Sequence, residues 1–268
     1  MDIKGVAAVT GAGRGIGLAT SIELANRGYE VLALVESEEM LDEVLRAAPA
    51  VHVRVLDVRN VGDFEFPDDL SVLVNNAGVR REYLPVEHID PADWRDVFEV
   101  NVFGMAELSR RAIPILRERG GGTICNVTSS AVLELGPFFG AYRCSKAAAS
   151  ALSEELRLEL APFGVRVVEI LPGPTTTAMA HDGVAAQFAE AVRYPAYEPM
   201  ARRQRELQAA VTRWASPEEV AAAIADAIND DGGPMRYGTD ALSWRRLTVW
   251  RQADDDEKVM GAALERYC

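Results

Sequence analysis

Tyr142 and Lys146 stand four positions apart, and together they could move a proton. The run that follows, Ala147–Leu152, is rich in strong helix formers. Residues four apart share one face of a helix, so the phenol and the ammonium can point into the same cleft. An ordinary tyrosine titrates at about pH 10, and an adjacent cation stabilises the phenolate and lowers that pKa. The pair is therefore a candidate for general acid–base catalysis.

The same spacing also occurs by chance on solvated helix faces, but the composition favours the catalytic interpretation. Of the 28 Lys and Arg residues, only Lys4, Lys146 and Lys258 are lysines. A chain that otherwise uses arginine has placed a lysine where a compact ammonium beside a tyrosine would be required.

A second chemical signal is the glycine-rich segment Thr10–Gly17, between an expected strand and an expected helix. Its glycines permit a tight turn and let backbone N–H groups approach a pyrophosphate at the helix N-terminus. The strict G-x-G-x-x-G spacing is not met, because Ile16 stands where its last glycine would fall. A plain strand–helix turn is the alternative. Asp57 could meet an adenine amino group, and Asn75–Gly78 offers small residues for close contact with a cofactor, which favours a nucleotide site.

Short apolar runs alternate with helical segments, as in a parallel sheet covered on both faces. The expected strands are Val6–Thr10, Val31–Val35, Val51–Val58, Val72–Asn75, Thr123–Thr128, Val165–Leu171 and Met235–Tyr237. The expected helices are Gly15–Asn26, Pro91–Glu118, Tyr142–Ala161 and a capped helix from Ser216 to about Asn229. The connection Arg59–Ser71 is too short for more than a rudimentary crossover helix. The pattern predicts an α/β fold, a Rossmann-like three-layer αβα sandwich with a parallel, doubly wound sheet, in one domain over residues 1–268.

Composition excludes several classes of protein. A net charge of −13 and no basic block argue against a nucleic-acid partner. Cys125, Cys144 and Cys268 form no ligand cluster, so neither a metal nor a disulfide framework is indicated. Neither a signal peptide nor a membrane-length apolar run is visible, and we expect a cytoplasmic protein with no membrane partner.

Taken together, these segments resemble the short-chain dehydrogenase/reductase family, from roughly Gly5 to Met179. The matching pieces, in family order, are the glycine turn, Asp57, Asn75–Gly78, Asn101, Ser129, Tyr142 with Lys146, and Pro172–Thr177. Ser129 stands thirteen positions before Tyr142, as the family pattern requires. The resemblance implies a catalytic tetrad of Asn101, Ser129, Tyr142 and Lys146, and a nicotinamide cofactor.

The resemblance also implies a role for each member of the tetrad. Tyr142 is the general acid/base, and Lys146 lowers its pKa and binds the nicotinamide ribose. Ser129 hydrogen-bonds the substrate oxygen, and Asn101 holds a water that relays protons to Lys146. Such a site combines acid–base catalysis with preorganised polar groups, while the cofactor supplies the redox chemistry.

The cofactor-binding residues implied by the resemblance surround the same cleft. They are Gly11, Arg14, Gly15, Ile16, Gly17, Glu36, Asp57, Val58, Asn76, Ala77, Gly78, Tyr142, Lys146, Pro172, Gly173, Thr175 and Thr177. Glu36 could accept hydrogen bonds from ribose hydroxyls and would repel a 2′-phosphate. Val35, however, occupies the usual place of an NAD-selecting aspartate, and Arg14 could favour the phosphate. The balance predicts NAD, with NADP left open.

A segment at about 178–214 corresponds to the family's substrate lid. It offers the apolar side chains Met179, Phe188, Val192, Tyr194, Tyr197 and Met200, which suit a hydrophobic alcohol or ketone. Phe138 and Phe139 could form another wall. The alternative is that these side chains pack against the body or a subunit partner. His181 is interpreted as a surface residue.

The sequence therefore predicts an NAD(P)-dependent alcohol dehydrogenase or ketone reductase. The alternatives are an NADPH-preferring carbonyl reductase and, in a different class, a nucleotide-sensing regulatory protein without turnover. By resemblance, the helical segments 91–118 and 142–161 form a subunit interface, and we expect a homodimer or homotetramer.

Overall fold

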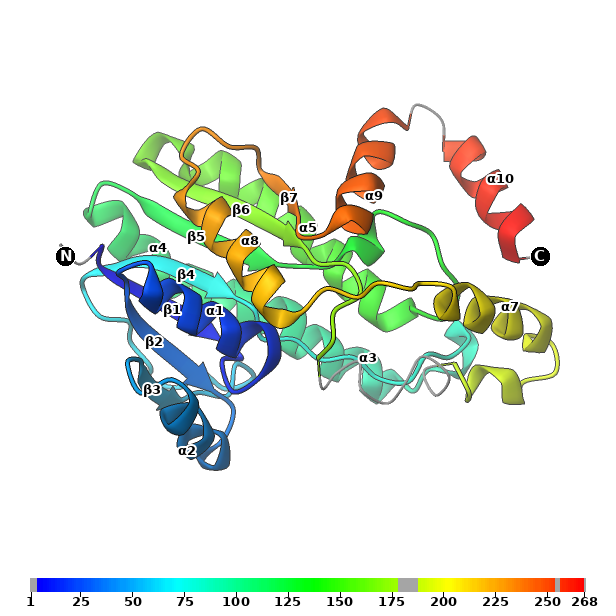
Figure 1. Cartoon of the computed structure of the whole chain (residues 1–268), viewed down its shortest axis with the longest axis horizontal. Helices are drawn as coiled ribbons and strands as arrows, with labels where there is room; N and C mark the ends of the chain where they lie inside the picture. The colour runs from blue at the N-terminus through cyan, green and yellow to red at the C-terminus, as the bar shows by residue number, and fades with distance from the viewer. Residues whose placement is uncertain (1–3, 178–187, 254–255, 268) are drawn as a thin grey trace.

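The computed structural model describes residues 4–177, 188–253 and 256–267. Within these residues, seven parallel strands form one sheet in the order β3-β2-β1-β4-β5-β6-β7 (Figure 1). The strands are β1 (Val6–Thr10), β2 (Glu30–Val35), β3 (His52–Val55), β4 (Leu70–Asn75), β5 (Gly122–Val127), β6 (Val165–Leu171) and β7 (Arg236–Gly238). The strand order reverses between β1 and β4, and doubly wound sheets bind ligands beyond the carboxyl ends of the strands at such a point.

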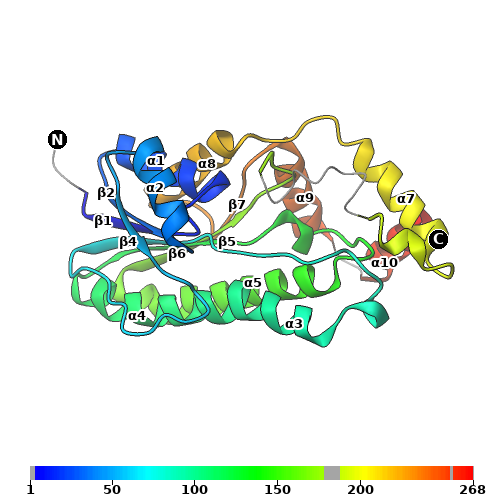
Figure 2. The ribbon, with the colours of Figure 1, turned by 90° about the horizontal axis from the view of Figure 1, so that it is seen from below.

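Helices cover both faces of the sheet, as Figure 2 shows edge-on. One face carries α1 (Gly15–Asn26), α2 (Glu38–Ala47) and α8 (Pro217–Asn229), and the other carries α3 (Pro91–Phe98), α4 (Met105–Glu118) and α5 (Gly140–Leu160). Side chains alternate along each strand, so Ala7 and Val9 of β1 enter the core under α1 and α8, while Val6 and Ala8 enter the core on the α4 and α5 side. The predicted three-layer fold is confirmed.

Several sequence-based boundaries agree with the structure residue by residue. β1, β6 and α1 have the expected limits. The start of α8 is the expected capping box: the Ser216 hydroxyl accepts from Glu219 N, and the Glu219 carboxylate accepts from Ser216 N. The chain between β3 and β4 forms turns rather than a crossover helix. At these places, the residues next to each boundary were sufficient to predict where the strand or helix begins or ends.

Two elements differ from expectation. The single helix expected over 91–118 is interrupted, because a π-helix, η2 (Glu99–Gly104), separates α3 from α4. The strand expected to run to Val58 ends at Val55, so Asp57 lies in the following loop and does not end the strand. The sequence interpretation also did not include α2.

The C-terminal part adds short helical elements around the cleft side of the sheet. They are η6 (Ala191–Arg193), α7 (Glu198–Ala209), α9 (Ala241–Gln252) and α10 (Asp256–Tyr267), with α10 in contact with α7. Three further single turns are η1 (Val86–His88), η3 (Ser130–Val132) and η4 (Ala161–Phe163). Across the described ranges, we find no helix with the length and apolar character needed to span a bilayer.

Candidate active site

A cleft of about 1090 Å³ opens beyond the carboxyl ends of the strands, where the strand order reverses. Ordinary ligand pockets measure roughly 300–1000 Å³, so this one has room for a dinucleotide and a second ligand. Every residue expected to act on substrate or bind cofactor lines it except Asn101: Gly11, Arg14, Gly15, Ile16, Gly17, Glu36, Asp57, Val58, Asn76, Ala77, Gly78, Ser129, Tyr142, Lys146, Pro172, Gly173, Thr175 and Thr177. The fold therefore brings residues from six loops to one place.

Tyr142 and Ser129 form the proton-handling part of the cleft. Tyr142 lies in the first turn of α5, and Ser129 caps the short turn η3 by accepting a hydrogen bond from Ala131 N at 3.1 Å. Burial raises the pKa of the Tyr142 phenol above its usual range, while the hydrogen bond from Ser129 and the charge of Arg80 act in the opposite direction. A neutral phenol that is hydrogen-bonded to a serine can deliver a proton to a substrate oxygen.

Lys146 lies one turn further along α5 and is almost fully buried. Its Nζ donates to the Val127 carbonyl at 2.9 Å. Burial lowers the pKa of this ammonium to about 8, against an opposing effect of the Glu169 carboxylate. The Nζ lies 6.0 Å from the centroid of the Tyr142 ring. The effects on the Tyr142 pKa in this structure are burial, the Ser129 hydrogen bond and the charge of Arg80, and the expected effect of Lys146 on that pKa stays a prediction.

Asn101 lies in the π-helix η2, behind the cleft wall, and not on its surface. Its Oδ1 accepts from Val79 N at 2.8 Å, and its Nδ2 donates to Val79 O and to Ser145 Oγ, both at 2.9 Å. π-Helical turns inside α-helices are often found at functional sites. Asn101 thus fixes the backbone that follows Gly78, and its expected role in holding a water stays a prediction.

The glycine turn is cross-linked to the segment after β4. Thr10 Oγ1 accepts from Asn76 N at 3.0 Å and Ala77 N at 2.9 Å, and Asn76 Nδ2 donates to Thr10 O at 2.9 Å. A Cβ placed on Gly17 would lie 2.2 Å from Gly11 O, so only glycine fits there. A Cβ on Gly78 would meet Asn101 Oδ1 and Lys146 Nζ at 3.3 Å. These small residues leave the close approach that a dinucleotide backbone needs, so the cradle fits the cofactor that the fold implies.

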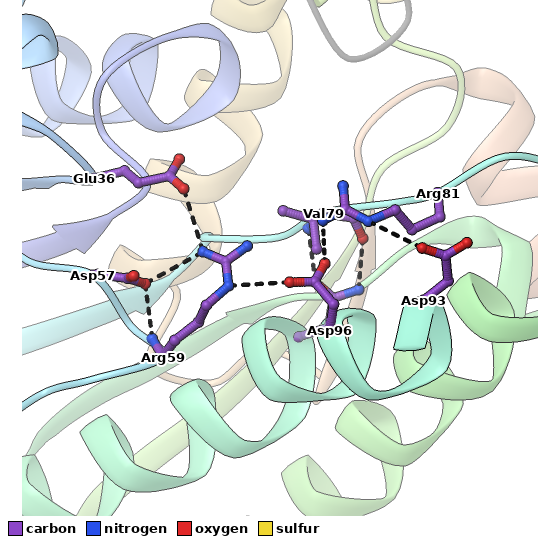
Figure 3. Close-up of polar contacts among 8 residues, drawn as sticks. Glu36, Asp57, Arg59, Val79, Arg81, Asp93 and Asp96 are labelled. Carbon is purple, nitrogen blue, oxygen red and sulfur yellow. Dashed lines mark hydrogen bonds and ion pairs between the residues drawn. The ribbon is translucent and has the colours of Figure 1, made fainter. Parts of the chain in front are cut away.

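Three carboxylates surround one guanidinium at the far end of the cleft (Figure 3). Arg59 Nη1 lies 3.3 Å from Glu36 Oε1 and 3.3 Å from Asp57 Oδ1, and its Nε lies 3.2 Å from Asp96 Oδ1. Asp57 Oδ1 also accepts from Arg59 N at 2.9 Å. The sequence interpretation identified Glu36 and Asp57 but missed Arg59, although it stands only two positions after Asp57. Arg14, the expected alternative phosphate ligand, lines the same cleft.

The loop after β6 is tied to the C-terminal part of the chain. Thr175 Oγ1 donates to Gly173 O at 3.0 Å, and Gly173 N donates to Asp240 Oδ2 at 3.0 Å. Asp240 also caps α9 by accepting from Leu242 N and Ser243 N. The loop expected to contact the nicotinamide is therefore anchored by a helix that the sequence interpretation did not include.

The apolar side chains expected to line the cleft pack elsewhere. Phe188 is fully buried and stacks on Tyr83 with ring centroids 5.0 Å apart, and Tyr194 stacks on His88 at 3.8 Å. The residues of this group that belong to the body rather than to the cleft lining are Phe188, Val192, Tyr194, Tyr197 and Met200. The hypothesis that Tyr194, Tyr197 or Met200 forms a pocket wall is therefore wrong, and Met179 and His181 lie outside the described residues. An apolar pattern predicts that side chains are buried, but it does not tell whether they pack against the body of the protein or line the cleft.

The cleft wall from the same segment is mixed in character. Its contributors are Glu190, Gln204, Leu207, Gln208, Val211 and Trp214. Phe139 also lines the cleft, as expected, whereas Phe138 is buried beside it with a backbone φ of 73°. A non-glycine residue in this left-handed region costs on the order of 1–3 kcal/mol and is typical of functional sites. It lies four residues before Tyr142.

The C-terminal helices contribute cleft residues that sequence reasoning missed. Arg246 of α9 donates to Ser130 Oγ at 3.0 Å and pairs with Glu134, which also pairs with Arg266 of α10. Arg246, Arg266 and Tyr267 line the cleft. No motif marks this segment, but Asp240 and Ser243 form a capping box that indicates the start of a helix.

Metal chemistry receives no support from the residues placed in the structure. Within the three described ranges, no group of three or more His, Cys, Asp or Glu side chains could hold an ion. Cys125 is buried and Cys144 is exposed, and both are free thiols; Cys268 lies outside the described residues.

Comparison with known proteins agrees with this geometry. The family model described as short chain dehydrogenase matches residues 5–187. The chain is 35% identical to the cis-4-hydroxycyclohexanecarboxylate dehydrogenase of Sinomonas cyclohexanicum over 238 residues, covering 84% of this chain and 89% of that protein. It is 31% identical to the 3beta-hydroxysteroid dehydrogenase 2 of Eggerthella lenta over 240 residues, covering 85% and 88%.

A solved structure shows the same likeness in three dimensions. The short-chain dehydrogenase from Burkholderia cenocepacia, in complex with NADP, superposes with a TM-score of 0.76 at 29% identity and covers 98% of both chains. The glycine turn, the Ser129–Tyr142 pair and the buried Lys146 lie within the span that the family model matches. The chain therefore belongs to the short-chain dehydrogenase/reductase family.

Proposed function

We propose that the protein is an oxidoreductase that transfers a hydride between NAD and a secondary alcohol or ketone with a hydrophobic body. The observation that carries this proposal is the convergence of Ser129, Tyr142 and Lys146 on one cleft that also contains the glycine turn. A regulatory protein that only binds the nucleotide would not need the buried Lys146, or the hydrogen bond between Ser129 and the Tyr142 phenol, in that cleft. The nicotinamide would supply or accept the hydride.

The protein's own groups would handle the proton and the developing charge. The Tyr142 phenol, held neutral by burial, gives its proton to a ketone oxygen or takes one from an alcohol. The Ser129 hydroxyl hydrogen-bonds the same oxygen and stabilises charge as it forms. Lys146 is a buried cation beside the Val127 carbonyl and would hold ribose hydroxyls. Proton transfer of this kind contributes roughly 10²- to 10⁴-fold to a rate.

The charge at the far end of the cleft supports NAD rather than NADP. Two arginines, Arg59 and Arg81, stand here among four carboxylates, those of Glu36, Asp57, Asp93 and Asp96. A 2′-phosphate brought to this end would meet excess negative charge, whereas ribose hydroxyls can donate to a carboxylate. An NADPH-preferring reductase remains the second candidate function, and Arg59 favours it, because the same guanidinium could turn to a phosphate if its carboxylate partners released it.

Two observations support the proposal that the substrate has a hydrophobic body. The side chains that line the cleft include the apolar ones of Leu135, Phe139, Leu207, Val211 and Trp214. Both relatives named above act, by their names, on ring-borne hydroxyl groups. Apolar linings with a few placed polar groups are typical of sites for such compounds.

The test follows nicotinamide absorbance while the protein is mixed with NAD or NADP and a panel of ring alcohols and ketones. Turnover should be found with NAD, and Tyr142→Phe should abolish it while NAD affinity, measured by titration, stays unchanged. Tyr197→Phe is the matched control, because that phenol lies outside the cleft and its loss should leave turnover intact. Near-normal turnover in Tyr142→Phe would refute the proposed role, and a clear NADP preference would favour the second candidate.

A further inference from the structure

One side chain that lines the cleft is polar and buried, yet its amide is not bonded within the part of the chain that the structure describes. Gln204 lies on α7, which stands beyond the carboxyl ends of the strands (Figure 1), and only 4% of the residue is exposed. Its Oε1 is enclosed and has no partner among the described residues, and no hydrogen bond joins its Nε2 to one of them. Gln204 lines the same cleft as Tyr142. A buried polar group without a partner lowers stability, so a ligand is the natural explanation for it.

Three other buried side-chain atoms lack a hydrogen-bond partner within the described ranges, and none is comparable. They are Thr20 Oγ1, Asn75 Oδ1 and Arg246 Nε. Neither Thr20 nor Asn75 lines the cleft. Arg246 lines it, but the two other nitrogens of its guanidinium are held by a hydrogen bond and an ion pair. Gln204 therefore combines a place in the cleft wall with a side chain that the described residues leave unanchored.

The face of α7 that carries Gln204 is mostly apolar. Residues three and four apart, and again seven apart, share one face of a helix. Ala201, one turn earlier, is buried in an apolar cluster, and Leu207 and Val211, further along, line the cleft. Gln208 also lines it, but that residue is partly exposed, so water can reach it. The Gln204 amide is thus an enclosed polar group in an apolar stretch of the wall.

Gln204 also lies beside the loop that leads to Tyr142. A Cβ placed on Gly136 would lie 3.8 Å from Gln204 Nε2 and 3.4 Å from Phe139 Cε2, so the amide and the ring flank the same glycine. Gly136 and Phe139 both line the cleft, and Phe139 stands three positions before Tyr142. The last torsion of a glutamine is broad and two-fold, so the amide can turn its oxygen or its N–H toward the cleft. A ligand lying along Phe139 therefore meets a hydrogen-bonding group on α7.

The chemistry of the amide indicates which group it would bind. Charged side chains of both signs line the cleft, but within the described ranges none is bonded to Gln204. An amide has no charge with which to balance a buried ion, so its ligand should be neutral. A hydroxyl group can donate to Oε1 or accept from Nε2 and therefore matches either orientation of the amide.

We propose that Gln204 recognises a second hydroxyl group on the substrate, so that the enzyme acts on hydroxyketones and diols with two oxygen functions at opposite ends of an apolar body. This inference rests on the proposed function and names its substrate class. The group to be converted lies at Ser129 and Tyr142, the apolar body lies against Phe139 and Leu207, and the remote hydroxyl bonds to the Gln204 amide.

The experiment compares a hydroxyketone with the ketone that lacks only the remote hydroxyl. Two pairs of different length are para-hydroxyacetophenone with acetophenone, and para-hydroxybenzylacetone with benzylacetone, assayed by NADH oxidation. A site built around a hydroxyl discriminates against an analogue without it, because the amide then stays unpaired. Gln204→Met keeps an unbranched side chain of similar length and removes the amide. The ratio of kcat/KM for hydroxyketone over ketone should be roughly tenfold to a hundredfold higher in the wild-type protein than in this variant, for at least one pair and mainly through KM.

Comparing the two proteins cancels the intrinsic difference in reactivity between the ketones, and the stability of the free protein tests for a purely structural role. Gln204→Met removes a buried amide that has no partner among the described residues, so its melting temperature should equal or exceed that of the wild type. A lower value would show that the protein itself satisfies the amide and would overturn the proposal. Gln252→Met is the matched control, because Gln252 is exposed at the end of α9 and lies outside the cleft. Its ratio and melting temperature should equal those of the wild type.

A binding measurement distinguishes failure of this inference from failure of the proposed function. Para-hydroxybenzylacetone should raise the melting temperature of the wild-type protein more than benzylacetone does, and Gln204→Met should remove the difference. If ketones are reduced but the ratio is the same in the wild type and in Gln204→Met, the hydroxyl site is refuted and the oxidoreductase stands. If no compound is turned over but the hydroxyketone still binds through Gln204, the hydroxyl site stands and the proposed function falls. If neither effect is found, both are refuted.

Discussion

Replacing Lys146 with methionine should stabilise the folded protein while it abolishes activity. The ammonium is almost fully buried, and burial lowers its pKa from 10.5 to about 8. At about 1.4 kcal/mol per pKa unit, keeping this group charged in the fold costs about 3 kcal/mol below pH 8. The variant also loses the hydrogen bond from Nζ to Val127 O, a loss of about 1 kcal/mol. The expected net gain in unfolding free energy is therefore about 2 kcal/mol at neutral pH.

The sign of the pH dependence follows from proton binding. Between the folded pKa of about 8 and the ordinary value of 10.5, the unfolded chain holds this proton and the folded chain has released it. The unfolded state therefore binds more protons, and stability rises with pH through this window. Below this pH window, Lys146 is charged in both states, and the full free-energy cost of burying its ammonium lowers the stability of the folded protein. The wild-type protein should gain on the variant as the pH rises from about 7 toward 10, until the advantage of Lys146→Met disappears.

The assay is urea unfolding of the wild-type protein and Lys146→Met without added nucleotide, repeated across this pH range. A gain of about 2 kcal/mol corresponds to a melting temperature roughly 4–6 °C higher. Lys4→Met is the control, because Lys4 is exposed and its loss should bring no gain. Lower or equal stability of Lys146→Met at about pH 7 would refute the reasoning, since it would mean that the buried ammonium is fully compensated by its surroundings.

Three further predictions test other parts of the molecule. Glu36→Gln should remove one of the three carboxylates around Arg59 and shift the ratio of NADP to NAD affinity upward by about fivefold, the equivalent of about 1 kcal/mol for a partly exposed charge; an unchanged ratio in direct titration would show that Glu36 does not contribute to the choice of cofactor. Gly17→Ala should weaken dinucleotide binding at least about tenfold, since its Cβ would lie 2.2 Å from a backbone oxygen and the turn must open; unchanged affinity by calorimetry would contradict the tight turn. The exposed side chains of Phe103 and Leu158, at 57% and 75% exposure, favour a subunit interface on the α4 and α5 side, so Leu158→Glu should lower the mass found by light scattering, and a monomeric wild-type protein would rule the interface out.

Much of the site could be predicted from the sequence because its chemistry depends on local spacing. Tyr142 and Lys146 share a face of α5 through helical geometry alone, and the glycine turn follows directly from β1. The continuous apolar run of β1 predicts a strand buried on both faces. Such features involve residues within a few positions of one another, so the backbone geometry that joins them is already known.

Contacts between distant segments could not be predicted in the same way. The apolar character of Phe188 and Tyr194 suggested a lining for a hydrophobic substrate, but tertiary packing placed them against Tyr83 and His88 and not in the cleft. Asn101, inside the π-helix, forms its hydrogen bonds with Val79, which is twenty-two positions away in the sequence.

The charges that line the cleft also depend on contacts between segments that are far apart in the sequence. The sequence by itself determined the fold class, the nucleotide end and the acid–base pair, because each is marked by residue types at short, fixed spacings. Only the tertiary structure brought Arg59 between Glu36 and Asp57, and Arg80 and Arg246 to the cleft that Tyr142 also lines. Charge–charge interactions depend on distance in space and on burial, neither of which a linear spacing fixes. The positions of the arginines that line the cleft could therefore not be predicted from an acidic composition.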